Sequence, residues 1–182
     1  ILRQLEGIDP ETAKAIIIGS LGGNDAQDLK NQNFKAKLSP NGSYYNNNIV
    51  PLMEELKRFQ DAGTNVAFFG LPFGREPGKT PIANDKREAA RFAMDVALAI
   101  AAADIFPDPQ KNPYHSVFKA TKEIKGSGGD VHYGGAKLKA YEKLLASLTG
   151  GDQPTKQEIA YARGGRGGGG ANGRPLRGPR FL

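Results

Sequence analysis

Two short apolar runs constrain the fold of this chain more than any other feature of its sequence. Residues 14–19 read KAIIIG and residues 65–71 read NVAFFGL, and after its first residue neither run contains a polar side chain. Short, uninterrupted apolar runs are typical of strands that are buried on both faces of a parallel sheet. Parallel strands need a crossover connection, usually a helix, so we expect helices between and after these strands.

Three longer segments carry the three-to-four spacing of amphipathic helices. This spacing predicts helices over residues 49–63, 85–103 and 136–148, and a shorter helix within residues 1–13. The pattern is carried by Ile49, Leu52, Met53, Leu56 and Phe59 in the first long helix, by Ala89, Phe92, Ala93, Val96, Ile100 and Ala103 in the second, and by Leu138, Tyr141, Leu144, Leu145 and Leu148 in the third.

The remaining segments complete the expected order of elements. Residues 26–48 are polar and are predicted to form a long loop, residues 104–106 a short third strand, and residues 114–124 a short helix. Helices that alternate with buried strands indicate an α/β fold with a parallel sheet.

The distribution of charged residues and glycines divides the chain into a body, residues 1–149, and a tail, residues 150–182. The formal net charge of the 182 residues is +6, and the tail, with six basic and two acidic residues, holds most of it. The absence of cysteine excludes disulfides, thiol nucleophiles and cysteine-ligated metal sites. No apolar run approaches the roughly 20 residues of a membrane-spanning helix.

The end of the tail suggests a binding partner. Residues 163–182 hold five arginines, eight glycines and no acidic residue, a composition similar to that of arginine–glycine segments that bind nucleic acid. The alternative is a flexible basic tail, because Phe181 is the only aromatic residue available for stacking. A glycine-rich segment of this kind does not order alone, so we expect a neighbouring chain in an assembly to hold it. The arginines are Arg163, Arg166, Arg174, Arg177 and Arg180.

Two loops carry side chains suited to catalysis. Gly22-Gly23-Asn24-Asp25 follows the first strand, and Gly129-Asp130-Val131-His132 precedes the last helix. A histidine beside a carboxylate can serve as a general base for a nucleophile, and an asparagine amide can donate to a developing oxyanion. The simpler alternatives are an Asx turn at the first loop and a helix-capping pair at the second.

The order of these motifs resembles that of the SGNH (GDSL-type) hydrolase family over residues 1–148. The matching segments are IIIGSLGGND at residues 16–25, VAFFGLP at 66–72 and GDVHY at 129–133. The resemblance implies a flavodoxin-like three-layer sandwich without cofactor or metal. It also implies that His132 is the general base, that Asp130 orients it, that Asn24 donates to the oxyanion, and that Gly23 and Pro72 contact substrate.

The chain departs from the family pattern at two places. The family's last block usually reads Asp-x-x-His, whereas Asp130 stands two residues before His132. No serine follows a Gly-Asp pair, and Ser20 fails the G-x-S-x-G pattern because Ile18 stands at the first glycine position. We therefore expect the nucleophile, and the two strands that precede Ile1 in the family fold, to belong to an upstream segment.

Other sequence features suggest weaker sites. Residues 74–79 lack the spacing of a phosphate-binding loop. Asp104, Asp108 and His115 could together form a metal site, but helix-end and turn positions account better for the two carboxylates. Tyr44 and Tyr45 could line a substrate cleft, although packing or a partner contact is the favoured role.

The sequence thus favours an esterase or deacetylase that acts on an acylated substrate, such as a cell-wall or surface carbohydrate, and is extracellular or in the cell envelope. The alternative is a structural, inactive SGNH-derived component of a large assembly such as a virion. A third hypothesis is nucleic-acid binding through residues 163–182, with an affinity that falls steeply as salt rises.

Overall fold

Three parallel strands form the centre of the structure, in the order β1 (Ala15–Ile18), β2 (Asn65–Phe69) and β3 (Tyr114–His115). The computed structural model describes residues 1–19, 22–74, 79–122, 124 and 135–149, so Asp130, His132 and the tail lie outside the described residues. In the register, Ile16 pairs with Val66, and Phe69 pairs with His115. The predicted α/β class with a parallel sheet is confirmed.

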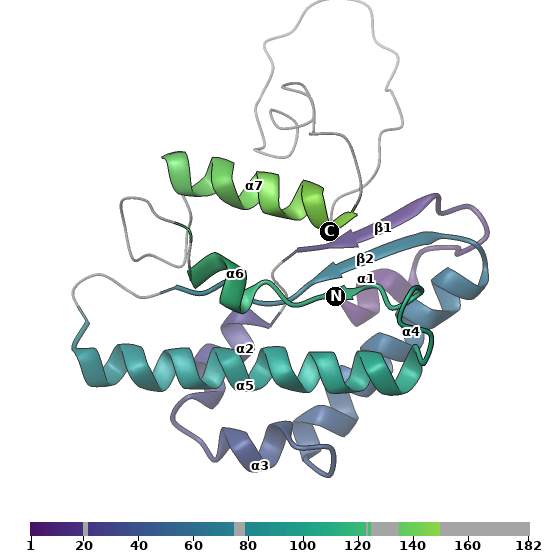
Figure 1. Cartoon of the computed structure of the whole chain (residues 1–182). Coiled ribbons are helices and arrows are strands. Elements are labelled where there is room, and N and C mark those ends of the chain that lie inside the picture. The colour runs from purple at the N-terminus through teal and green to yellow at the C-terminus, as the bar shows by residue number, and fades with distance from the viewer. Residues whose placement is uncertain (20–21, 75–78, 123, 125–134, 150–182) are drawn as a thin grey trace, which may run out of the picture.

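Eight helical segments surround this sheet in the described part of the chain (Figure 1). The predicted short first helix and the three predicted long helices are confirmed as α1, α4, α5 and α7. The segments are α1 (Leu2–Glu6), α2 (Gly23–Leu29), α3 (Phe34–Leu38), the π-helical turn η1 (Tyr45–Ile49), α4 (Val50–Asp61), α5 (Pro81–Ile105), α6 (Phe118–Lys122) and α7 (Gly135–Thr149).

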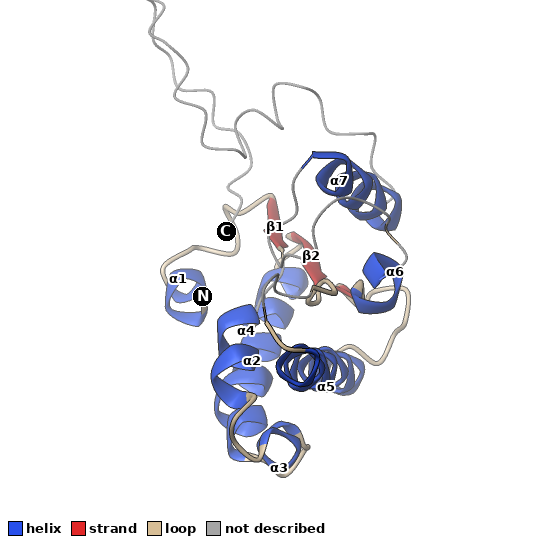
Figure 2. Cartoon of the chain, turned by 90° about the vertical axis from the view of Figure 1, so that its left-hand side faces the viewer, coloured by secondary structure: helices blue, strands red, loops and turns tan. Residues whose placement is uncertain are grey.

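Helices cover both faces of the sheet because successive side chains of a strand point to opposite sides. Ile16, Ile18 and Phe68 belong to the main core, which α4 and α5 complete. Ile17 and Phe69 pack on the other face, with the leucines of α7. Figure 2 shows the strands between α7 on one side and α4 and α5 on the other.

The predicted third strand at residues 104–106 was wrong. α5 continues through Ile105, and the amide of Phe106 still donates to the carbonyl of Ala102 at 2.8 Å. The third strand forms instead at residues 114–115, within the predicted short helix, where the amide of Phe68 donates to the carbonyl of Pro113 at 2.8 Å. Only residues 118–122 of that predicted helix are helical, as α6.

The predicted loop over residues 26–48 was also wrong, because local capping and distant packing produce α2, α3 and η1 there. The side chain of Asn33 accepts a hydrogen bond from the amide of Ala36 and caps α3. Leu29, Leu38 and Tyr45 are all at least 95 % buried in the main core.

The apolar stripe that predicted α5 faces outward rather than into the core. Phe92, Val96 and Ile100 are each more than a third exposed. Met94 and Leu98, on the opposite side of the helix, are buried. Although α5 is long and rich in alanine, no helix in the described part of the chain meets the length and hydropathy needed to cross a bilayer.

Candidate functional site at the carboxyl edge of the sheet

The turn between β1 and α2 places Asn24 at the carboxyl edge of the sheet. Gly22 adopts a left-handed conformation with φ of 88°, which glycine tolerates without strain. α2 begins at the next residue, so Asn24 lies in its first turn. The Asn24 side chain is exposed.

The loop after β2 packs against this turn. A Cβ built on Gly23 would lie 3.6 Å from Cδ2 of Leu71, and Pro72 is buried beside it. The sequence predicted Gly23, Asn24 and Pro72 as site residues, and the structure brings their two loops together. It does not describe the predicted base and its partner.

A buried arginine fixes the loop after β2. Nε and Nη2 of Arg91, on α5, donate to the carbonyl oxygen of Pro72 at 3.2 and 2.7 Å. The backbone amide of Phe73 donates to the hydroxyl of Thr121, on α6, at 2.7 Å. Charged and hydroxyl groups buried in this way cost free energy unless they are hydrogen-bonded, so these contacts hold the loop in one conformation.

A buried carboxylate joins α5 to β3 at the same edge. Oδ1 of Asp95 accepts a hydrogen bond from the hydroxyl of Tyr114 at 2.5 Å, and Oδ2 accepts one from the hydroxyl of Ser116 at 2.6 Å. Burial raises the pKa of Asp95 despite these hydrogen bonds, which act in the opposite direction. Burial and the nearby Asp95 carboxylate also raise the pKa of Tyr114.

Sequence reasoning missed these contacts. Arg91 and Asp95 lie in the predicted helix over residues 85–103, and Tyr114 and Ser116 lie in the predicted short helix over residues 114–124. One available signal was that Arg91 and Asp95 are the only charged residues between positions 89 and 103. Two charges four residues apart in an alanine-rich helix mark one face as different from the rest.

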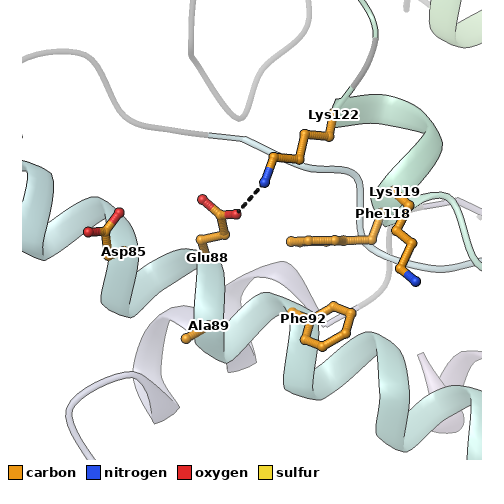
Figure 3. A pocket seen from close by; sticks show the side chains of 7 residues that line it. All are labelled: Asp85, Glu88, Ala89, Phe92, Phe118, Lys119 and Lys122. Carbon is orange, nitrogen blue, oxygen red and sulfur yellow. Dashed lines mark hydrogen bonds and ion pairs between the residues drawn. The ribbon is translucent and has the colours of Figure 1, made fainter.

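Beside this edge lies an open pocket of about 480 Å³ between α5 and α6 (Figure 3). The rings of Phe92 and Phe118 form its apolar wall, with centroids 5.5 Å apart. Nζ of Lys122 lies 3.3 Å from Oε1 of Glu88 at its rim. The pocket can therefore accept a molecule that is partly apolar and partly polar.

A smaller cavity of about 200 Å³ lies beside the start of α2, with Gly22, Asp25 and Tyr44 among its lining residues. Burial and a hydrogen bond to Asp25 raise the pKa of the Tyr44 phenol, so it stays protonated and can donate. Tyr45 is buried in the main core, which confirms packing as its role.

The three residues considered as a metal site have other contacts. Asp104, in the last turn of α5, accepts from the hydroxyl of Tyr45 at 3.5 Å. Asp108 accepts from the backbone amide of Gln110 at 3.0 Å in a turn, and His115 stacks on Phe69 at 5.3 Å between ring centroids. No cluster of three or more metal-ligating side chains occurs among the residues that the structure describes.

Comparisons with known proteins return no match. No family model, no curated protein and no solved structure matches this chain.

Proposed function

We propose that this chain carries the general base and an oxyanion donor of an SGNH-type esterase or deacetylase. The observation that supports this function is that two segments of the chain begin at the same edge of the sheet. The β1–α2 turn with Asn24 lies at the carboxyl edge, and α7, which follows His132 in the sequence, starts at the same end (Figure 1). The other end of α7 lies near the opposite edge of the sheet, because Leu148 lines a cavity together with Ala15 and Asn65, the first residues of β1 and β2.

Each residue has a defined part in the proposed acyl transfer. His132 takes the proton of the attacking serine and later returns it to the leaving alcohol, and Asp130 orients the imidazole. The side-chain amide of Asn24 donates to the oxyanion that forms when the serine adds to the ester carbonyl. The serine comes from a segment outside these 182 residues, because no serine here follows a Gly-Asp pair.

The surroundings of Asn24 suit an acylated substrate such as a carbohydrate ester. The Arg91–Pro72 hydrogen bonds keep the neighbouring loop in place. Further along this edge, the Phe118 ring and the charged rim could contact the apolar and polar parts of the substrate.

Activity on p-nitrophenyl acetate tests this function. The chain is co-expressed with any polypeptide that its gene encodes before Ile1, and Asn24→Ala and His132→Ala are compared with the parent. We expect Asn24→Ala to lower kcat by about 10²–10³-fold and His132→Ala to abolish measurable turnover. Asn31→Ala, at another exposed asparagine, is the matched control and keeps full activity. Full activity in His132→Ala would refute the proposal.

A second candidate function is a structural role in a larger assembly, and one observation favours it. The outward face of α5 is apolar, as a surface that packs against another chain would be. A parent protein that shows no hydrolysis, but whose α5 face mediates association, would favour this role over the enzyme.

A further inference from the structure

The exposed hydrophobic side chains of this protein gather on one helix. Five large hydrophobic side chains are exposed in the described part of the chain, and four of them lie on α5. Their exposed fractions are 70 % for Ile82, 43 % for Phe92, 39 % for Val96 and 37 % for Ile100. Such clustering marks an interaction surface, whereas single exposed hydrophobic residues need no explanation.

The polarity of α5 is reversed relative to that of an ordinary surface helix. Between positions 89 and 103 its charged residues, Arg91 and Asp95, are 5 % and 4 % exposed and point into the protein. Its outward side over the same stretch is apolar for about 22 Å, at 1.5 Å per residue. Figure 2, which views α5 along its axis, shows it near the boundary of the molecule, and α6 contacts this side of α5 at Phe92, whose ring lies 5.5 Å from that of Phe118.

We propose that this face packs antiparallel against α5 of a second copy of the chain. In a two-fold interface each contact occurs twice, so the face must be complementary to itself. If the two-fold axis of the dimer passes beside Val96, Phe92 meets Ile100 of the second copy, because each lies four residues from Val96. Ala89 meets Ala103, each seven residues away, and these small side chains allow the two helices to approach closely.

Charge complementarity supports a second copy as the occupant. Lys86 and Asp104 are both exposed and lie eighteen residues apart, which is about five helical turns. They therefore lie along the same side of α5, and the antiparallel arrangement brings each beside the opposite charge on the second copy. The exposed carboxylates of Asp85 and Asp104 at the two ends of the stripe disfavour an anionic membrane surface as the alternative.

Sedimentation velocity on the full 182-residue chain over the micromolar range tests the proposal. We expect a dimer for the parent and at least a thirtyfold weaker association for Val96→Glu, because a charge at the centre of an apolar interface removes its main contact. Ile1→Glu changes the one large hydrophobic residue outside α5 that is exposed in the described part of the chain, and it is the matched control, which stays dimeric. Circular dichroism checks that each variant is folded.

Charge reversal tests the antiparallel arrangement itself. Lys86→Glu and Asp104→Lys should each weaken the dimer, and the double variant should restore it. A monomeric parent, a dimer that survives Val96→Glu, or a double variant weaker than either single variant would each overturn the proposal. The proposal does not depend on the esterase assignment, because these measurements do not involve catalysis.

Discussion

At the scale of single residues, Gly70 lets two polar side chains meet at the end of β2. A Cβ at this position would overlap Oδ1 of Asp95 and the hydroxyl of Tyr114. The short hydrogen bond between these groups therefore requires a residue without a side chain at position 70. The backbone of Gly70 also continues the sheet, since its amide donates to the carbonyl of His115 at 2.9 Å.

Gly70→Ala should destabilise the protein by about 1–3 kcal/mol, because an added methyl group forces a packed network apart. Gly19→Ala is the matched control, since a Cβ there meets no atom within 4 Å, and it should change stability by less than about 0.5 kcal/mol. Urea denaturation measures both variants. Equal midpoints for the two would contradict the role assigned to Gly70.

At the scale of elements, α5 positions the loop after β2. Arg91 reaches from the buried side of the helix to the carbonyl oxygen of Pro72 and makes two hydrogen bonds to it. Because Arg91 is 5 % exposed, water cannot replace these hydrogen bonds easily. The conformation of this loop thus depends in part on a side chain of α5, together with the Thr121 hydroxyl of α6 that accepts from the amide of Phe73.

Arg91→Met should cost about 2 kcal/mol of stability, because it leaves the buried carbonyl of Pro72 without its donor. Arg58→Met is the matched control on α4. The Arg58 side chain is 43 % exposed and pairs with Glu55 within one helix, so its loss should cost at most about 1 kcal/mol. Thermal unfolding compares the two, and an equal loss in both would contradict a structural role for Arg91.

At the scale of the whole molecule, the second face of the sheet is assembled from distant parts of the chain. Phe69 and His115 are paired across β2 and β3, and their rings stack on this face. Phe69 also belongs to the small core that α7 completes. Burial lowers the pKa of His115 from its usual 6.5, so the structure favours the neutral imidazole.

This shift predicts a loss of stability in acid. Because the folded state has the lower pKa, the unfolded state binds a proton first as the pH falls. The contribution of His115 is therefore fully present above about pH 6.5 and is lost as the pH falls through its folded-state pKa. His115→Gln removes the titration, so the stability of the parent relative to this variant should fall below pH 6.5. Urea unfolding across the acid range measures the difference, and a pH-independent difference would contradict the prediction.

The sequence by itself determined the first two strands and the long helices. Uninterrupted apolar runs identify β1 and β2 because both faces of those strands are buried, and a three-to-four spacing identifies α4, α5 and α7. It also placed Gly23, Asn24 and Pro72 at strand ends, which in a parallel sheet lie at one edge. The roles of Asp130 and His132 stay predictions, since both lie outside the described residues.

Only the tertiary structure decided where β3 forms, which side of α5 is buried and which groups Asp95 contacts. β3 is two residues long, too short to leave a sequence pattern, and it exists because β2 offers it an edge to pair with. The orientation of α5 could not be predicted, because an alanine-rich helix is apolar on several sides. Which of these sides is buried depends on the elements that pack against the helix. The Asp95 network joins residues that the sequence separates and that only the folded chain brings within hydrogen-bonding distance.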